Sequence, residues 1–274
     1  MGLSGFIGVL LGFLAIFAGI ATSGKLSDYW EWSSVLITIG GTICATMASY
    51  SFKQFIAIGK MIRIAWSKYE IDYKESIETL LNLSVIQRRE GTLALEEAAY
   101  KLNDTFLKKG IMMVVDGSDS EMVKNTMETE MNAIEERHTR GQEVFLSMSS
   151  YSPAFGMVGT LIGLINMLRN LNNIDSLGLN MAVALITTFY GVIMANLVLT
   201  PLAKRLKERT ELEMRHKAMI LEGVLAIQAG LNPRVIEQKL KAFLSETEIA
   251  EMERENQATE EHRIPVREAA ERSA

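Results

Sequence analysis

The sequence predicts an all-α, four-span polytopic membrane protein with a small helical cytoplasmic domain between spans 2 and 3 and a helical C-terminal extension. The 274 residues are 48% hydrophobic and 22% charged, and the charged residues avoid four long stretches. Each stretch exceeds the roughly 20 apolar residues that cross a bilayer as a helix. So much apolar surface could not be hidden from water in one soluble core. The charge-free stretches are 1–24, 32–52, 144–168 and 176–203.

The first two stretches place transmembrane helices 1 and 2 within residues 1–52. The N-terminal stretch differs from a cleaved secretion signal, because it begins without Lys or Arg and its apolar part is too long. The single cysteine, Cys44, excludes an intrachain disulfide and a zinc site built on paired cysteines.

The distribution of Lys and Arg predicts the orientation. Of the 28 basic residues, 13 lie between the second and third stretches and another 13 follow the fourth. Because basic residues near the spans favour the cytoplasmic side, both large polar segments are expected inside, together with both termini. Short links at about 25–31 and 169–175 are then external.

Residues 53–143 are expected to form a cytoplasmic helical domain. One helix ends at Arg88 and Arg89 followed by Gly91, which are basic residues in a last turn and a typical stop signal. Without further information, Arg88 and Glu96 read as solvated helix charges.

The sequence of the rest of this domain predicts two further helices. The second runs from Thr92 to Gly110. A turn with a capping box from Ser118 to Glu121 then opens a helix that continues without a breaker into the third span.

Residues 144–203 hold transmembrane helices 3 and 4, and residues 204–244 form a cytoplasmic helical extension with a corner at Gly230 and Pro233. Residues 245–274 hold nine acids and four bases and few apolar residues, which predicts a disordered charged tail.

The three histidines lack metal-site spacing and are expected on the solvated surface: His138, His216 and His262. With no nucleotide-binding, hydrolase or metal motif, we expect no enzyme activity, no cofactor or metal, and no nucleic-acid partner.

No ionisable residue lies at membrane depth, although transporters usually keep one there. If the chain conducts ions, a charged ligand must come from another chain. Hydroxyl and amide side chains distinguish the third and fourth spans from the first two, and Thr160 and Thr188 lie well inside, where a hydroxyl could replace part of an ion's water shell. Pro153 and Pro201 each allow a bend.

Small residues form helical stripes that let helices approach closely. The stripe in the first span serves either packing within the chain or packing between copies. The stripes are Ser4, Gly8, Gly12, Ala15 and Gly19 in the first span, Gly159 and Gly163 in the third, and Ala184, Thr188, Gly191 and Ala195 in the fourth.

Several motifs together resemble the A subunit of bacterial flagellar motor stators, the MotA/PomA/MotP family. They are PAFG in the third span, TTFYG in the fourth and the NPR corner, set in a four-span pattern that covers residues 1–244. The resemblance implies a homo-pentamer around a dimer of B subunits (MotB/PomB type). Each B subunit supplies one membrane Asp and a peptidoglycan anchor.

The resemblance also implies roles for individual residues. Arg88 and Glu96 would pair with opposite charges on the rotor protein FliG. Thr160, Thr187 and Thr188 would line the ion pathway, and the two prolines, Pro153 and Pro201, would couple ion flow to torque.

The expected function is therefore conversion of cation flow into torque for swimming, in the bacterial cytoplasmic (inner) membrane. Sodium is favoured over protons, because sodium-type members carry the GTLIGL pattern and a sodium ion needs several oxygens. The alternatives are a TolQ/ExbB-type energiser subunit, which has three spans, and a structural scaffold without ion flux.

Overall fold

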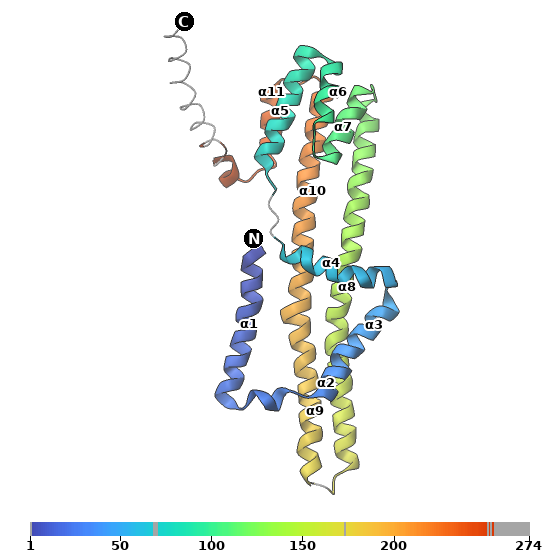
Figure 1. Cartoon of the computed structure of the whole chain (residues 1–274), viewed down its shortest axis with the longest axis vertical. Helices are drawn as coiled ribbons and strands as arrows, with labels where there is room; N and C mark the ends of the chain where they lie inside the picture. The colour runs from blue at the N-terminus through green and yellow to red at the C-terminus, as the bar shows by residue number, and fades with distance from the viewer. Residues whose placement is uncertain (1, 68–70, 173, 251, 253, 255–274) are drawn as a thin grey trace. The chain divides into compact units, whose positions relative to one another are not determined.

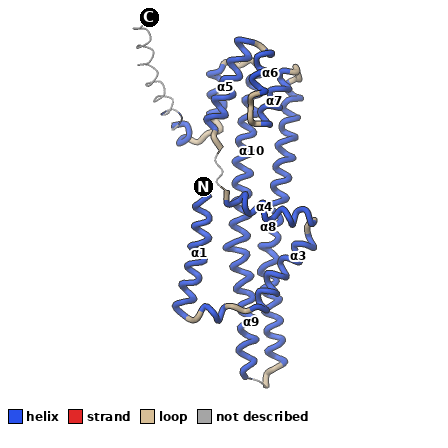
Figure 2. The backbone as a smooth tube through the Cα atoms, viewed as in Figure 1, coloured by secondary structure: helices blue, strands red, loops and turns tan. Residues whose placement is uncertain are grey.

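The structure is a computed structural model that describes every residue except 1, 68–70, 173, 251, 253 and 255–274. The described residues are helical or lie in short connections, with no strand among them (Figure 2). The chain divides into two compact units, residues 1–69 with 134–211, and residues 70–133 with 212–274. We describe each unit by itself, although the helices α8 and α10 contribute residues to both (Figure 1).

Four helical segments are long and apolar enough to cross a membrane, which confirms the expected class. Helix α1 (Gly2–Ser23) is the first, and a short 3-10 turn η1 (Leu26–Tyr29) follows it. The second span combines α2 (Trp32–Val35), the π-helical turn η2 (Leu36–Gly40) and α3 (Gly41–Ser49). Helix α4 (Phe52–Trp66) comes next.

The third and fourth spans belong to long helices. Helix α8 (Ser120–Arg169) is continuous through Pro153, so the prediction that it runs unbroken into the third span is confirmed. The fourth span consists of α9 (Ile174–Ile193) and the π-helical turn η3 (Met194–Leu199), which leads directly into α10 (Thr200–Gln228). Within the first unit, α8 and α9 lie side by side (Figure 1).

The second unit packs α5 (Tyr73–Glu90), α6 (Thr92–Tyr100), α7 (Thr105–Val115) and α11 (Pro233–Lys241) around one apolar core. The ends of α8 and α10 that belong to this unit complete it. The largest fully buried side chains of this core are Ile77, Leu80, Leu95, Phe106, Ile111, Met127, Met219, Ile220, Ile227, Ile236 and Leu240.

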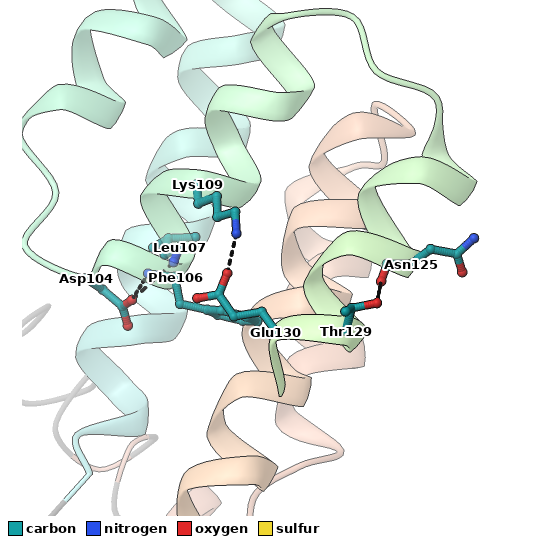
Figure 3. Close-up of polar contacts among 7 residues, drawn as sticks. All are labelled: Asp104, Phe106, Leu107, Lys109, Asn125, Thr129 and Glu130. Atoms are coloured by element: carbon teal, nitrogen blue, oxygen red, sulfur yellow. Dashed lines mark hydrogen bonds and ion pairs between the residues drawn. The ribbon is translucent and has the colours of Figure 1, made fainter. Parts of the chain in front are cut away.

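Capping explains where these helices begin and corrects two predictions. The single helix expected over 92–110 is wrong, because α6 ends at Tyr100 and the Asp104 carboxylate accepts hydrogen bonds from the first amides of α7, Phe106 at 2.8 Å and Leu107 at 3.1 Å (Figure 3). The capping box at Ser118 is also wrong. Asp119 accepts from the Met122 amide at 2.7 Å instead.

A salt bridge joins α7 to α8 within this unit. The Lys109 ammonium lies 2.5 Å from the Glu130 carboxylate, and both side chains point into the space between the two helices (Figure 3). Both remain partly exposed, so the pair contributes little stability on its own, about 0–1 kcal/mol.

At the C-terminal corner, Gly230 adopts a positive φ of 65° and Asn232 caps α11, whose first residue is Pro233. This confirms the predicted corner. The expected disorder of the tail does not hold at its start, since residues 246–250 are helical. The Ser245 amide donates to the Glu248 carboxylate at 2.8 Å, and Met252 is buried. The greater part of the predicted tail lies outside the described residues.

Candidate functional site in the third and fourth spans

Glycines bring α8 and α9 into backbone contact. A Cβ atom on Gly163 would lie 2.6 Å from the Asn180 carbonyl oxygen, and one on Gly191 would lie 2.7 Å from the Ser152 carbonyl oxygen. A Cβ on Gly156 would lie 3.1 Å from the Thr188 Cα. The two helices can approach this closely only because these positions lack side chains. Gly156 was not among the small residues that the sequence singled out.

This close approach brings the hydroxyls of Thr160 and Thr188 together. Their Oγ1 atoms lie 2.6 Å apart, and both side chains are half-buried. The carbonyl oxygens of Gly156 and Ala184 also lie within hydrogen-bonding distance, at 3.1 and 3.0 Å from Thr160 Oγ1. We call these four atoms the oxygen cluster. All four are uncharged oxygens at membrane depth, and they can solvate a cation but cannot neutralise it.

Thr187 meets the oxygen cluster only at the Ala184 carbonyl oxygen, which accepts a hydrogen bond of 3.0 Å from the Thr187 hydroxyl. Its side chain is fully buried on another face of α9, where its hydroxyl donates to backbone carbonyls of its own helix and its methyl group lies against Gly159. Its carbonyl oxygen accepts a hydrogen bond of 3.2 Å from the Thr38 hydroxyl. The structure thus brings the hydroxyls of two of the three predicted ion-pathway residues into direct contact, and it links the third to them through the shared Ala184 carbonyl oxygen.

The second span carries polar side chains that the sequence analysis overlooked. Four hydroxyl residues with i, i+4 spacing are completely buried along it: Ser34, Thr38, Thr42 and Thr46. The prediction that hydroxyls distinguish the third and fourth spans from the first two is therefore wrong. Thr42 and Thr46 donate to carbonyls one turn back, whereas Thr38 donates across to α9. The four-residue spacing alone could have revealed this stripe.

The two prolines lie beside a hydrogen bond that connects the third and fourth spans. The Ser149 hydroxyl lies 2.7 Å from the Thr200 hydroxyl, and Ser149 also donates to the Ala195 carbonyl at 3.4 Å. Pro153 lies one turn after Ser149, and Pro201 directly follows Thr200. Since proline cannot donate a backbone hydrogen bond, both helices lack a bond close to this link. The π-helical turn η3 lies in the same place, and such turns often occur at functional sites.

The second candidate site is the turn between α5 and α6 in the other unit. Gly91 joins the helices with a φ of 86°, a conformation that favours glycine. Arg88 is exposed in the last turn of α5, and Glu96 is half-buried on α6. Within the described part of the chain, neither forms an ion pair. Leu93, between them in sequence, is 80% exposed although it is apolar. This turn therefore presents unpaired charges and one apolar side chain.

His216 contradicts the expectation of a solvated surface histidine. Its Nε2 atom lies 2.7 Å from the Ser76 hydroxyl, and its ring meets the Tyr73 ring edge-on with centroids 5.5 Å apart. Burial lowers the pKa of His216 below its usual 6.5, an effect that the Asp104 carboxylate opposes and the Lys217 ammonium reinforces. Tyr73 has a raised pKa, mainly because of burial. No sequence pattern pointed to this contact.

Among the described residues, no group of three or more His, Cys, Asp or Glu side chains is placed to hold a metal ion. The candidate sites are therefore the oxygen cluster, which holds two of the predicted ion-pathway threonines, and the α5–α6 turn, which holds the predicted rotor-binding residues.

The four candidate spans and the comparison with known proteins place the chain among membrane ion-channel subunits. Residues 98–219 match the MotA/TolQ/ExbB proton channel family. The chain is 42% identical to motility protein A of Borreliella burgdorferi over 89% of this chain and 95% of that protein. It is 36% identical to chemotaxis protein PomA of Vibrio alginolyticus, with 90% and 96% covered.

A solved structure agrees. The flagellar MotAB stator complex from Bacillus subtilis superposes with a TM-score of 0.84 at 32% identity, covering 90% of this chain and 97% of that one. The chain therefore belongs to the motility protein A family.

Proposed function

We propose that this chain is the A subunit of a flagellar motor stator, which forms an ion channel together with a B subunit. The observation that carries the proposal is the oxygen cluster. It gathers the hydroxyls of Thr160 and Thr188 and two carbonyls in spans without a charged residue. Family membership and the superposition on a MotAB complex support the same conclusion.

The spans contain no acidic side chain, so the negative charge that a cation needs must come from a partner chain. A cation at membrane depth needs a negative counter-charge, because transfer of an isolated charge out of water is very costly. A B subunit of the MotB/PomB type would place its membrane Asp beside the oxygen cluster. Both threonines are only half-buried, so part of each residue remains open to such a neighbour. We expect a homo-pentamer around a B dimer, whose peptidoglycan anchor holds the complex against the rotor.

Sodium is the favoured coupling ion. A proton needs only the carboxylate and a chain of waters, whereas a sodium ion must replace several water oxygens. The oxygen cluster supplies such oxygens from two hydroxyls 2.6 Å apart and two backbone carbonyls. Swimming driven by this stator is expected to fade when sodium is replaced by potassium at constant pH. Unchanged swimming speed would assign the motor to protons.

The α5–α6 turn is the proposed contact with the rotor protein FliG. Arg88 and Glu96 carry opposite charges that are not used in ion pairs within the described chain, so both can pair with a partner. Exposed charge pairs are worth about 0–1 kcal/mol each, which suits contacts that form and break at every step of rotation. The apolar Leu93 adds surface that a partner can cover.

Torque coupling is assigned to Pro153 and Pro201. Both lie next to the Ser149–Thr200 hydrogen bond, and both weaken backbone bonding in their helices. A small displacement of atoms at the ion site can therefore bend the third and fourth spans near these prolines, whereas a rigid helix would not bend.

The proposal places the protein in the bacterial inner membrane with both termini cytoplasmic. A TolQ/ExbB-type energiser is the second candidate, favoured by the shared family match. Such subunits have three spans and a periplasmic N-terminus, whereas this chain has four candidate spans. A tag at Met1 that is labelled only after permeabilisation of the inner membrane supports the stator, and labelling in intact spheroplasts supports the energiser.

A further inference from the structure

Helix α4 directly follows the second span, and hydrogen bonds define both of its ends. The second span ends at Ser49, and α4 begins only three residues later at Phe52. At its start, the Ser51 amide donates to the Gln54 side chain at 3.0 Å. At its end, the Arg209 guanidinium donates to the Ile64 carbonyl at 2.7 Å, where a cation stabilises a helix C-terminus.

One face of α4 is covered by the protein. Ala65 is buried, and Ile58, Met61 and Trp66 pack with it on an apolar cluster of the same unit. The Trp66 ring also meets the Phe6 ring edge-on, with centroids 5.6 Å apart. The residues of α8 and α10 in that cluster are Val144, Phe145, Met148, Leu202, Ala203 and Leu206. These contacts determine which face of α4 points away from the protein.

The outer face of α4 combines apolar and basic side chains. Phe52 is 68% exposed and Ile56 is 65% exposed, although both are large and apolar. Lys53, Lys60 and Arg63 are exposed on the same side, and no Asp or Glu occurs between residues 52 and 66. None of the three basic side chains forms an ion pair within the described residues.

We propose that the outer face of α4 binds anionic phospholipid headgroups of the adjacent membrane leaflet. Apolar side chains of such a helix enter the boundary between headgroups and acyl chains, while Lys and Arg attract phosphate groups. The short connection from Ser49 keeps Phe52 at the membrane surface. A second copy that met this face through the same face would bring like charges together, so charge complementarity favours lipid. This site does not depend on the motor function.

Native mass spectrometry can test the proposal on the purified stator complex. The complex in detergent is titrated with phosphatidylglycerol or with phosphatidylcholine, and bound lipids are counted. The test variant combines K53Q, K60Q and R63Q. The matched control combines K101Q, K124Q and K239Q, which removes the same charge from exposed positions in the other unit.

We expect phosphatidylglycerol to bind more tightly than phosphatidylcholine to the natural protein. The test variant should raise the apparent Kd for phosphatidylglycerol about fivefold or more, since each basic residue near an anionic surface contributes about a fivefold factor. Binding of phosphatidylcholine and the control variant should be unchanged. Equal affinity for the two lipids, or an equal shift in both variants, would overturn the proposal.

A second measurement separates lipid from protein as the occupant. Phe52→Cys in a Cys44→Ser background is reconstituted in vesicles that contain phosphatidylglycerol and treated with a water-soluble oxidant. We expect little disulfide formation between copies and slow labelling by a water-soluble maleimide. Efficient disulfide formation would assign the face to a second copy, and rapid labelling would show that it faces water. Either result would refute lipid binding.

Discussion

Substitution of Gly191 by Ala tests whether backbone contact between α8 and α9 supports the oxygen cluster. The added Cβ would lie 2.7 Å from the Ser152 carbonyl oxygen and 3.1 Å from the Pro153 Cα, both of them backbone atoms. Ordinary contact begins at 3.4 Å, so the helices must separate locally by about 0.7 Å. Overpacking of this kind costs about 1–3 kcal/mol. The separation would also stretch the Thr160–Thr188 contact, one turn away from Gly191.

The assay compares thermal unfolding of the purified stator complex with swimming speed of cells that carry the same variant. Gly178→Ala on α9 is the matched control, because no other atom lies within 4 Å of its added Cβ. Gly12→Ala is a second control, since its close neighbour is the flexible end of the Leu197 side chain. Any gain in helix propensity is common to all three variants and cancels in the comparison.

We expect only Gly191→Ala to lower both the unfolding temperature and the swimming speed. If Gly191→Ala is as stable and as motile as Gly178→Ala, the close helix contact is not required, and the reasoning from the glycines fails.

The remaining predictions concern the oxygen cluster, the rotor contact and the half-buried His216. Thr160→Val with Thr188→Val removes both hydroxyls at nearly constant volume, so swimming should fall while co-purification with the B subunit persists; unchanged swimming would favour a scaffold without ion flux. Arg88→Glu should reduce torque through like-charge repulsion, and a charge reversal in FliG should restore part of it. If the swimming speed of Arg88→Glu with Glu96→Lys is normal, the rotor assignment is wrong. Because the folded state lowers the pKa of His216, the unfolded state binds more protons, and stability should fall as the pH drops below about 6.5. His216→Gln should lessen this acid dependence of the unfolding temperature, and an unaltered dependence would assign it to other groups.

The sequence predicted the membrane spans because a charged side chain without a partner of opposite charge is too costly to place in the hydrocarbon core of a bilayer. That physical rule acts on composition alone, so all four spans were identified without knowledge of packing. The end of α5 at Gly91 and the corner at Pro233 were predictable for a similar reason, since local backbone preferences determine them.

Other features depended on contacts between distant residues. The sequence placed Thr160 and Thr188 inside their spans, but only the packing of α8 on α9 brings their hydroxyls into direct contact, while Thr187 meets them only at the Ala184 carbonyl oxygen. His216 was misjudged because its partners, Tyr73 and Ser76, come from a helix more than a hundred residues earlier.

The break between α6 and α7 was missed for a different reason. Apolar spacing continues across it, and the capping signal at Asp104 outweighs that spacing locally. The buried hydroxyl stripe of the second span was missed because its residues read as ordinary polar breaks in an apolar run, although their four-residue spacing was visible.

The most direct test of the account is cation flux through vesicles that contain this chain alone or together with its B subunit. The spans offer uncharged oxygens but no charged residue, so we predict flux only when a B subunit with its membrane Asp is present and loss of that flux when the Asp becomes Asn. Cation flux through vesicles that contain this chain alone would contradict the account.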